Sequence, residues 1–171
     1  MRLILAYNQE LLERIDALLL QLSDDDLSAS RAILFGSSIG GHFRHILEFY
    51  TCLLAREDEH RFSYDHRRRD PLIEESVIAA HACAARCKGL LADEISDREL
   101  YMASALPGGE ALTEQRTTLA RELTYLADHS VHHLAMVRIA LEQELPRVHF
   151  PEHLGVAAST RNHQARASAA N

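Results

Sequence analysis

Three histidines lie within five residues of one another near the end of the sequence, at positions 129, 132 and 133. Apolar residues recur at intervals of three and four across residues 118–144, and this periodicity predicts a long amphipathic helix. Side chains four positions apart lie on one face of a helix, about 6 Å apart, so His129 and His133 can both reach one point, with His132 on the flank. This spacing suits a divalent metal ion. The simpler interpretation is a set of boundary histidines that hydrogen-bond to their neighbours.

Two more histidines, His42 and His45, fall in a second predicted helix, at residues 38–56. A metal held structurally takes four protein ligands, whereas three histidines leave positions for water or a substrate. The third ligand beside His129 and His133 is then either His45, at the edge of the apolar stripe, or His42, inside it. Gly40 and the glycine after it cost helix propensity, which indicates either close backbone packing or a frayed first turn.

The elements that must position these residues are long helices. The periodicity predicts four of them, with a weak hairpin pattern at residues 100–105 and a Pro-Gly-Gly turn at 107–109; the helices span residues 2–22, 38–56, 71–92 and 118–144. Residues 23–36 read as an unassigned connection, and the chain after His163 has little to bury and should fray. We therefore predict an all-α fold: one four-helix-bundle domain over residues 1–160 and a flexible tail over 161–171.

Composition limits the classes of function. A chain of 171 residues with 47% hydrophobic and 25% charged residues should form one globular domain. The net charge of -7 would repel nucleic acid and anionic membranes, so we expect neither as a partner. No apolar run approaches the ~20 residues of a membrane span, and the first residues do not resemble a signal peptide.

The three cysteines are an odd number, and all fall in predicted helices rather than in loops that disulfides would join. This usage favours the reducing cytoplasm. Cys83 and Cys87 are four residues apart, but without an equally spaced partner they are better read as small buried core residues than as metal ligands.

Two stretches of the sequence resemble the DinB/YfiT-like family of helical metalloproteins. The first is Ser-Ile-Gly-Gly-His-Phe-Arg-His-Ile-Leu-Glu at residues 38–48, and the second is Arg-Glu-Leu at 121–123 followed by the histidines at 129–133. The resemblance implies a four-helix bundle that binds zinc, nickel or iron through His45, His129 and His133. An aliphatic residue and then an acid follow His45, as in the family pattern, whereas Phe and Arg follow His42, so the resemblance makes His42 a packing or supporting residue.

The same resemblance implies an enzyme. Family members with assigned activity include thiol-dependent S-transferases and isomerases, so the expected reaction is attack on a small electrophile by metal-bound water or thiolate, in the manner of a hydrolase or an S-transferase. A low-molecular-weight thiol is a candidate cofactor, a small molecule the substrate, and a homodimer the expected assembly. His132, His42 and Tyr50 are the candidates for moving protons. The alternative is a non-catalytic metal-binding or stress-response module, whose site should be closed by a fourth protein ligand.

Residues around the predicted site have candidate roles as well. Tyr64, Arg67, Arg68 and Arg69 are candidates for binding an anionic thiol cofactor or a carboxylate substrate at the mouth of the site, or else form a solvated charged loop. Asp128 and Glu48 are candidates for orienting the ligating imidazoles, or else are ordinary helix-surface residues.

Overall fold

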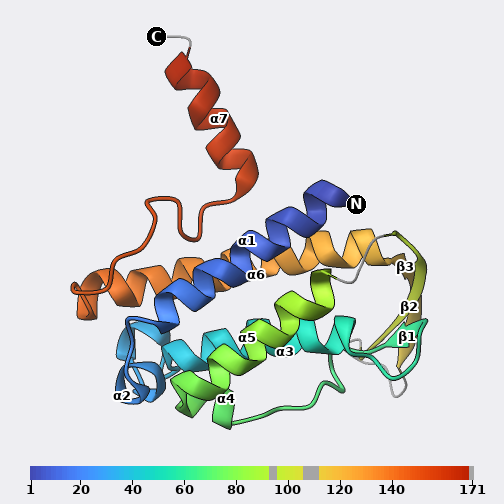
Figure 1. Ribbon diagram of the computed structural model, residues 1–171, viewed down its shortest axis with the longest axis horizontal. Coiled ribbons are helices and arrows are strands. Elements are labelled where there is room, and N and C mark those ends of the chain that lie inside the picture. Colours follow the sequence, from blue (N-terminus) through green and yellow to red (C-terminus); the bar gives the residue numbers. More distant parts are fainter. Residues whose placement is uncertain (93–95, 106–111, 170–171) are drawn as a thin grey trace.

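The fold is mostly helical, with a small three-stranded sheet at one end (Figure 1). The computed structural model describes residues 1–92, 96–105 and 112–169; the predicted turn at 107–109 lies outside this part. The long helices are α1 (Arg2–Leu19), α3 (Ile39–Leu54), α5 (Val77–Ala92) and α6 (Leu119–Glu144). The shorter elements are α2 (Asp24–Ser28), a 3-10 turn (Ala32–Leu34), β1 (Arg61–Phe62), α4 (Leu72–Glu75), β2 (Glu99–Ser104), β3 (Thr113–Thr118) and α7 (Ala158–Ala169).

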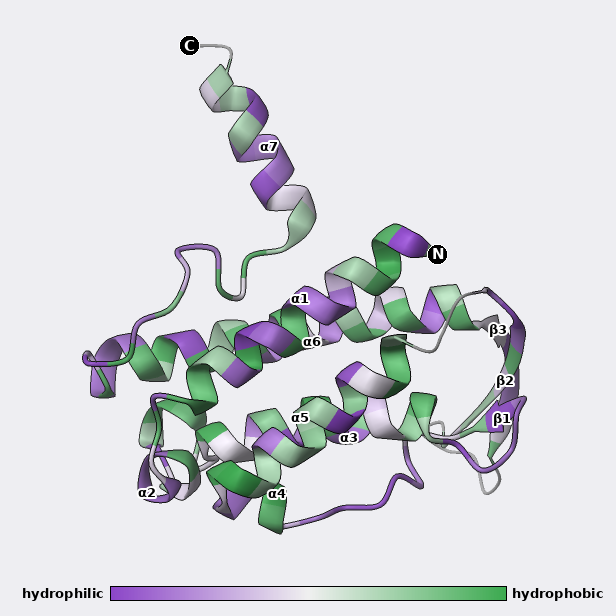
Figure 2. Cartoon of the chain, viewed as in Figure 1, coloured by the Kyte–Doolittle hydropathy of each residue, from purple (hydrophilic) through white to green (hydrophobic). Residues whose placement is uncertain are grey.

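The four long helices enclose the core. α1 packs against α5 and α6, and α3 packs against the same two helices. The hydrophobic stripes on these helices (Figure 2) supply the fully buried side chains, among them Leu11, Ile15, Phe43, Leu53 and Leu134. Within the described residues, no helix is both long and apolar enough to cross a bilayer. This packing places α3 and α6, which carry the predicted site, side by side.

Helix α3 begins at a close contact with α4. The Ser38 hydroxyl accepts a hydrogen bond from the Gly41 N–H at 2.8 Å and donates one to the Glu74 carboxylate at 2.7 Å. A Cβ atom on Gly40 would lie 2.2 Å from the Glu74 carbonyl oxygen, a distance that no real contact allows. Of the two interpretations of the glycine pair, close backbone packing is therefore confirmed, and the start of α3 is fixed three residues before His42.

The hairpin predicted before the last long helix is present. Strands β2 and β3 pair antiparallel, and Thr118 at the end of β3 caps α6 by accepting from the Arg121 N–H. The predicted all-α fold did not include β1, which adds a third strand parallel to β2. β1 is two residues long, too short to show any periodicity in the sequence.

Three predicted segments differ in the structure. The helix predicted over residues 71–92 is broken at Ser76, which has an extended backbone, and the Asp24 carboxylate accepts from the Val77 N–H at 2.7 Å to start α5. The unassigned segment contains α2, which Ser23 and Asp26 cap reciprocally. Where fraying was predicted, α7 forms a helix, but none of its residues is buried and it stands away from the core (Figure 1).

Candidate metal centre

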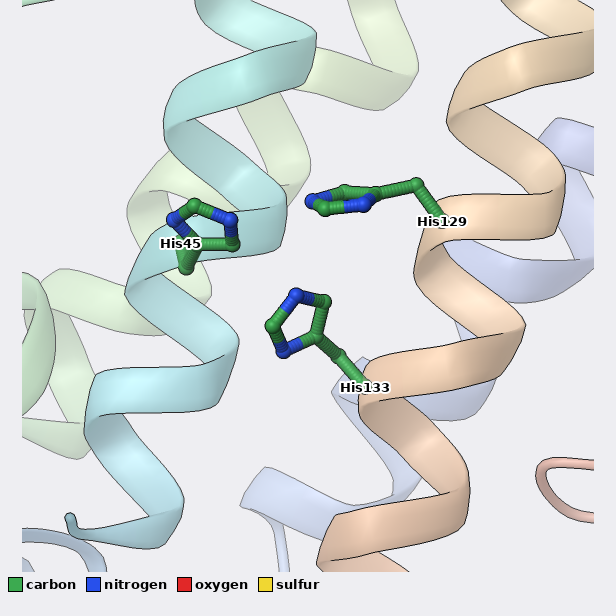
Figure 3. Close-up of side chains that lie close together, drawn as sticks. All are labelled: His45, His129 and His133. Atoms are coloured by element: carbon green, nitrogen blue, oxygen red, sulfur yellow. The ribbon is translucent and has the colours of Figure 1, made fainter. Parts of the chain in front are cut away.

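The side chains of His45, His129 and His133 meet between α3 and α6 (Figure 3). One ring nitrogen of each lies within 4.8 Å of the others. Their ring centroids are 5.0 Å apart for His45 and His129, 4.7 Å for His45 and His133, and 4.6 Å for His129 and His133. Imidazole nitrogens are preferred ligands of zinc, nickel and iron, so this group can hold a divalent cation.

The positions of the three histidines follow from the helices. Helices α3 and α6 run in opposite directions, because His42 lies against His133 while Phe49, further along α3, lies against His129. The face of α6 is set by its buried residues, and His129 and His133 lie at the boundary of that face, half-buried, one turn apart. The helix pair therefore brings two histidines from one helix and one from the other to a single point.

The ring nitrogens leave the centre of the group unfilled by protein donors. Nδ1 of His133 is 2.9 Å from Nδ1 of His42, so its other nitrogen, Nε2, is the one directed at His45 and His129. When His133 donates its Nδ1 proton to His42, its Nε2 carries the lone pair that a metal needs. Nε2 of His129 is buried and has no hydrogen-bond partner among the described residues. A bound cation would satisfy such an orphaned acceptor.

Burial and mutual repulsion keep these imidazoles neutral. Burial, followed by the charges of His129 and His45, lowers the pKa of His133 to about 3. Burial, followed by the charges of His129 and Arg67, lowers the pKa of His45 to about 4. The pKa of His129 is lowered by burial and then by His132 and Arg67. At neutral pH all three rings are in the deprotonated form that binds metals.

Arg67 joins the cluster to a buried acid. Its guanidinium donates to Glu48 Oε2 and to His45 Nδ1, both at 3.3 Å, and Glu48 also accepts from the Asp70 N–H at 2.8 Å. Glu48 thus holds the Arg67 guanidinium that contacts His45. Because a guanidinium can only donate, His45 Nδ1 accepts this bond, and ligation through Nε2 requires the ring proton to move to Nδ1 and this contact to change.

Aromatic rings continue from the histidines toward the hairpin. His129 stacks between Phe49, at 4.7 Å, and Tyr125, at 5.5 Å, and Phe49 stacks in turn on Tyr64 at 4.6 Å. These three aromatic residues also form one wall of a pocket of about 380 Å³, whose other side is made by β2 and β3. The pocket is therefore lined by the residues that stack on His129, while none of the three histidines lines it.

The remaining candidates have different surroundings. Tyr50 is fully buried and its hydroxyl donates to Asn8 of α1 at 2.6 Å, so it belongs to the core. His132 is exposed, and its ring lies 5.4 Å from that of His133. The Tyr64 hydroxyl donates to Glu122 at 3.0 Å. Asp128 is exposed and hydrogen-bonds to nothing in the part of the chain that the structure describes, which leaves it an ordinary surface residue.

The three arginines of the predicted cationic loop have different surroundings. Arg67 contacts the cluster, Arg68 lines a second cavity on the far side of Glu48, and Arg69 is exposed and lines neither. Phe49 and Tyr125 were not among the predicted site residues, although each is four residues from a predicted ligand, His45 or His129. Helical register alone would have found them.

Comparison with known proteins gives one match. The sequence model of the DinB family matches residues 1–144, which include every residue of the histidine cluster. No curated protein matches the chain. No solved structure matches it either. Because the match covers most of the chain and ends with helix α6, the protein belongs to the DinB family.

Proposed function

We propose that the protein is a divalent-metal-dependent enzyme that acts on a small electrophilic substrate, as a hydrolase or as a thiol S-transferase. The observation that carries the proposal is the group of three half-buried, neutral imidazoles, one of which has a buried nitrogen without a partner. A zinc, nickel or iron ion held there would lower the pKa of a bound water or thiol enough to give a nucleophile near neutral pH.

The number of ligands favours an enzyme over a closed binding module. Among the described residues, the group that can hold a metal has three members, and His42 faces the outer nitrogen of His133 rather than the centre. A cation with three protein ligands keeps a position for a substrate. A structural or sensing site would be expected to use four.

The pocket beside His129 supports a small substrate. Its aromatic wall of Phe49, Tyr64 and Tyr125 suits an apolar group. Arg116 and Arg121 also line it, but they form ion pairs with Glu99 and Glu122, so a negative charge on the substrate would compete with these acids. Of the candidates for proton transfer, His132 is the one whose ring is both exposed and next to a ligand. We assign it the role of carrying protons between the site and solvent.

Elemental analysis of the protein purified without a His tag tests the metal. We expect about one divalent ion per chain, lost in His45→Ala, His129→Ala and His133→Ala and kept in His132→Ala. A preparation that is free of metal and cannot be reloaded would end the proposal.

Activity is tested on the metal-loaded protein with ester, phosphoester and thiol-conjugation substrates. Turnover that falls in His132→Ala, at full metal content, supports the enzyme and the proton carrier. Full metal content without turnover on any of these classes would favour the non-catalytic module instead.

We also infer some general properties of the protein. The mutual packing of α1, α3, α5 and α6 supports a four-helix bundle. The free thiols support a cytoplasmic protein. A homodimer is expected for a bundle of this family, and light scattering that gave a mass near 19.2 kDa would contradict it. A low-molecular-weight thiol remains our proposed cofactor.

A further inference from the structure

A second cavity, of about 660 Å³, lies between α3, α5 and the loop before α4. Glu48 and Arg67 form part of its wall, and none of the three clustered histidines lines it. Its floor includes Thr51 from α3 and Cys83 from α5. The cavity is therefore separate from the metal centre, and neither the proposed reaction nor the family match gives it a role.

Cys83 is placed as a nucleophile in this cavity. Its thiol is half-buried, and the Thr51 hydroxyl lies 3.8 Å from its Sγ and 3.5 Å from that of Cys87. A hydrogen bond from Cys87, with smaller contributions from Thr51 and the charge of Arg86, holds the pKa of the Cys83 thiol below its usual value. Such a thiol is partly ionised at neutral pH, and the thiolate is the reactive form.

The other two thiols are held unreactive. Cys87 is fully buried, and its hydrogen bond to Cys83, together with burial, raises its pKa. Cys52 lines the same cavity, but its thiol donates a hydrogen bond to the Ser63 carbonyl at 3.2 Å, and burial raises its pKa to about 11. Cys83 is thus the reactive one of the three cysteines.

The charge around Cys83 selects an anionic partner. Arg68 and Arg86 line the cavity, and neither forms an ion pair or hydrogen bond with another described residue. Three acids line the same cavity. Glu48 is bound by Arg67 and by the Asp70 N–H, and the Asp70 carboxylate accepts from the Leu72 N–H at 3.2 Å. Against these two acids and Glu57, the lining carries four arginines, Arg56, Arg67, Arg68 and Arg86. Two arginines without acidic partners beside a thiol favour a reagent that carries carboxylates.

We propose that Cys83 is a modification site for carboxylate-bearing, low-molecular-weight disulfides, which Arg68 and Arg86 bind. The Cys83 thiolate attacks one sulfur of the disulfide. A bond forms between Sγ and that sulfur, the original S–S bond breaks, and the other half leaves as a thiolate. The external disulfide is the only oxidant, and the product is a mixed disulfide on Cys83.

The test compares two disulfide reagents on the full chain. One is dithiobis(nitrobenzoic acid), which carries two carboxylates, and the other is dithiodipyridine, which is neutral at pH 7.5. We expect a fast phase with both reagents, lost in Cys83→Ser and kept in Cys52→Ser. The double variant Arg68→Gln/Arg86→Gln should slow the anionic reagent about tenfold and leave the neutral one within about twofold. Arg69→Gln, the neighbouring arginine outside the cavity, should change neither rate.

Oxidised glutathione then tests the modification on the unaltered protein. Peptide mapping should find one glutathione on Cys83. Modification of Cys52 in its place, the absence of any adduct, or an equal effect of the arginine variants on both reagents would each overturn the proposal. Because none of these measurements requires a metal or turnover, their outcome is independent of the proposed enzyme.

Discussion

Tyr64→Phe tests whether the buried side chain of Glu122 depends on the hydrogen bond from the Tyr64 hydroxyl beside the aromatic stack. Glu122 is 2% exposed and accepts from the Tyr64 hydroxyl at 3.0 Å and from the Thr117 hydroxyl at 2.7 Å. A hydrogen bond to a charged group contributes about 1.5–3 kcal/mol. Because Thr117 still satisfies one oxygen, we expect a loss at the lower end, about 1.5–2 kcal/mol. For a chain of this length the melting temperature should fall by roughly 3–8 °C.

Urea unfolding at pH 7 measures the loss, and Tyr125→Phe is the matched control. Tyr125 belongs to the same stack, but its half-exposed hydroxyl has no hydrogen-bond partner among the described residues. Removing it should change the free energy of unfolding by less than about 0.5 kcal/mol. If the two variants were equally stable, Glu122 would not depend on Tyr64, and the Tyr64 hydroxyl would be free to serve a ligand.

Three further predictions concern the helices that carry the site. His42→Ala should weaken metal binding about 10- to 100-fold in a chelator competition, because it removes the partner of His133 Nδ1; a complete loss, equal to that of His133→Ala, would make His42 a ligand. The metal-free protein should lose stability as the pH falls from about 6.5 toward 4, because the unfolded state then binds protons that His45 and His133, with folded pKa values of about 4 and about 3, do not; denaturant unfolding at several pH values measures this, and a flat profile would contradict it. Gly40→Ala should lower the free energy of unfolding by about 1–3 kcal/mol or more, because the added methyl group clashes with α4. Gly89→Ala has open space around it and should stabilise α5 by up to about 1 kcal/mol. Thermal unfolding compares the two variants, and equal melting temperatures would refute the close contact at Gly40.

Sequence patterns predicted those elements whose signals all lie within one short stretch of the chain. Helix α6 was predicted to within one residue of its start, because its periodicity, its Thr118 cap and Pro146 are all close in the sequence. The pairing of His129 with His133 is likewise a property of one helix. The break at Ser76 depends on Asp24, which is 53 positions from the residue it caps, and no local pattern contains it.

The contacts around the site could not be predicted for the same reason, since they join residues that are far apart in the sequence. Tyr64 meets Glu122 across 58 positions of sequence, and Arg67 meets His45 across 22. An arginine-rich loop reads as a solvated surface until the fold shows which guanidinium turns inward. The family resemblance favoured His45 over His42 as a metal ligand, and this choice stays a prediction; in the structure His42 lies against the outer nitrogen of His133.

The pairing of α3 with α6 also sets the order in which a newly made chain can acquire its histidine cluster. His42 and His133 are 91 positions apart, and the two clustered histidines on α6 follow almost everything else in the core. During synthesis, the earlier part of the chain offers His42 and His45 alone, separated by three positions on one helix. The three-histidine group exists only after α6 has emerged and packed against α3. A chain that stops before α6 therefore cannot assemble the group, and a metal bound by it would mark a chain whose four long helices have all been made.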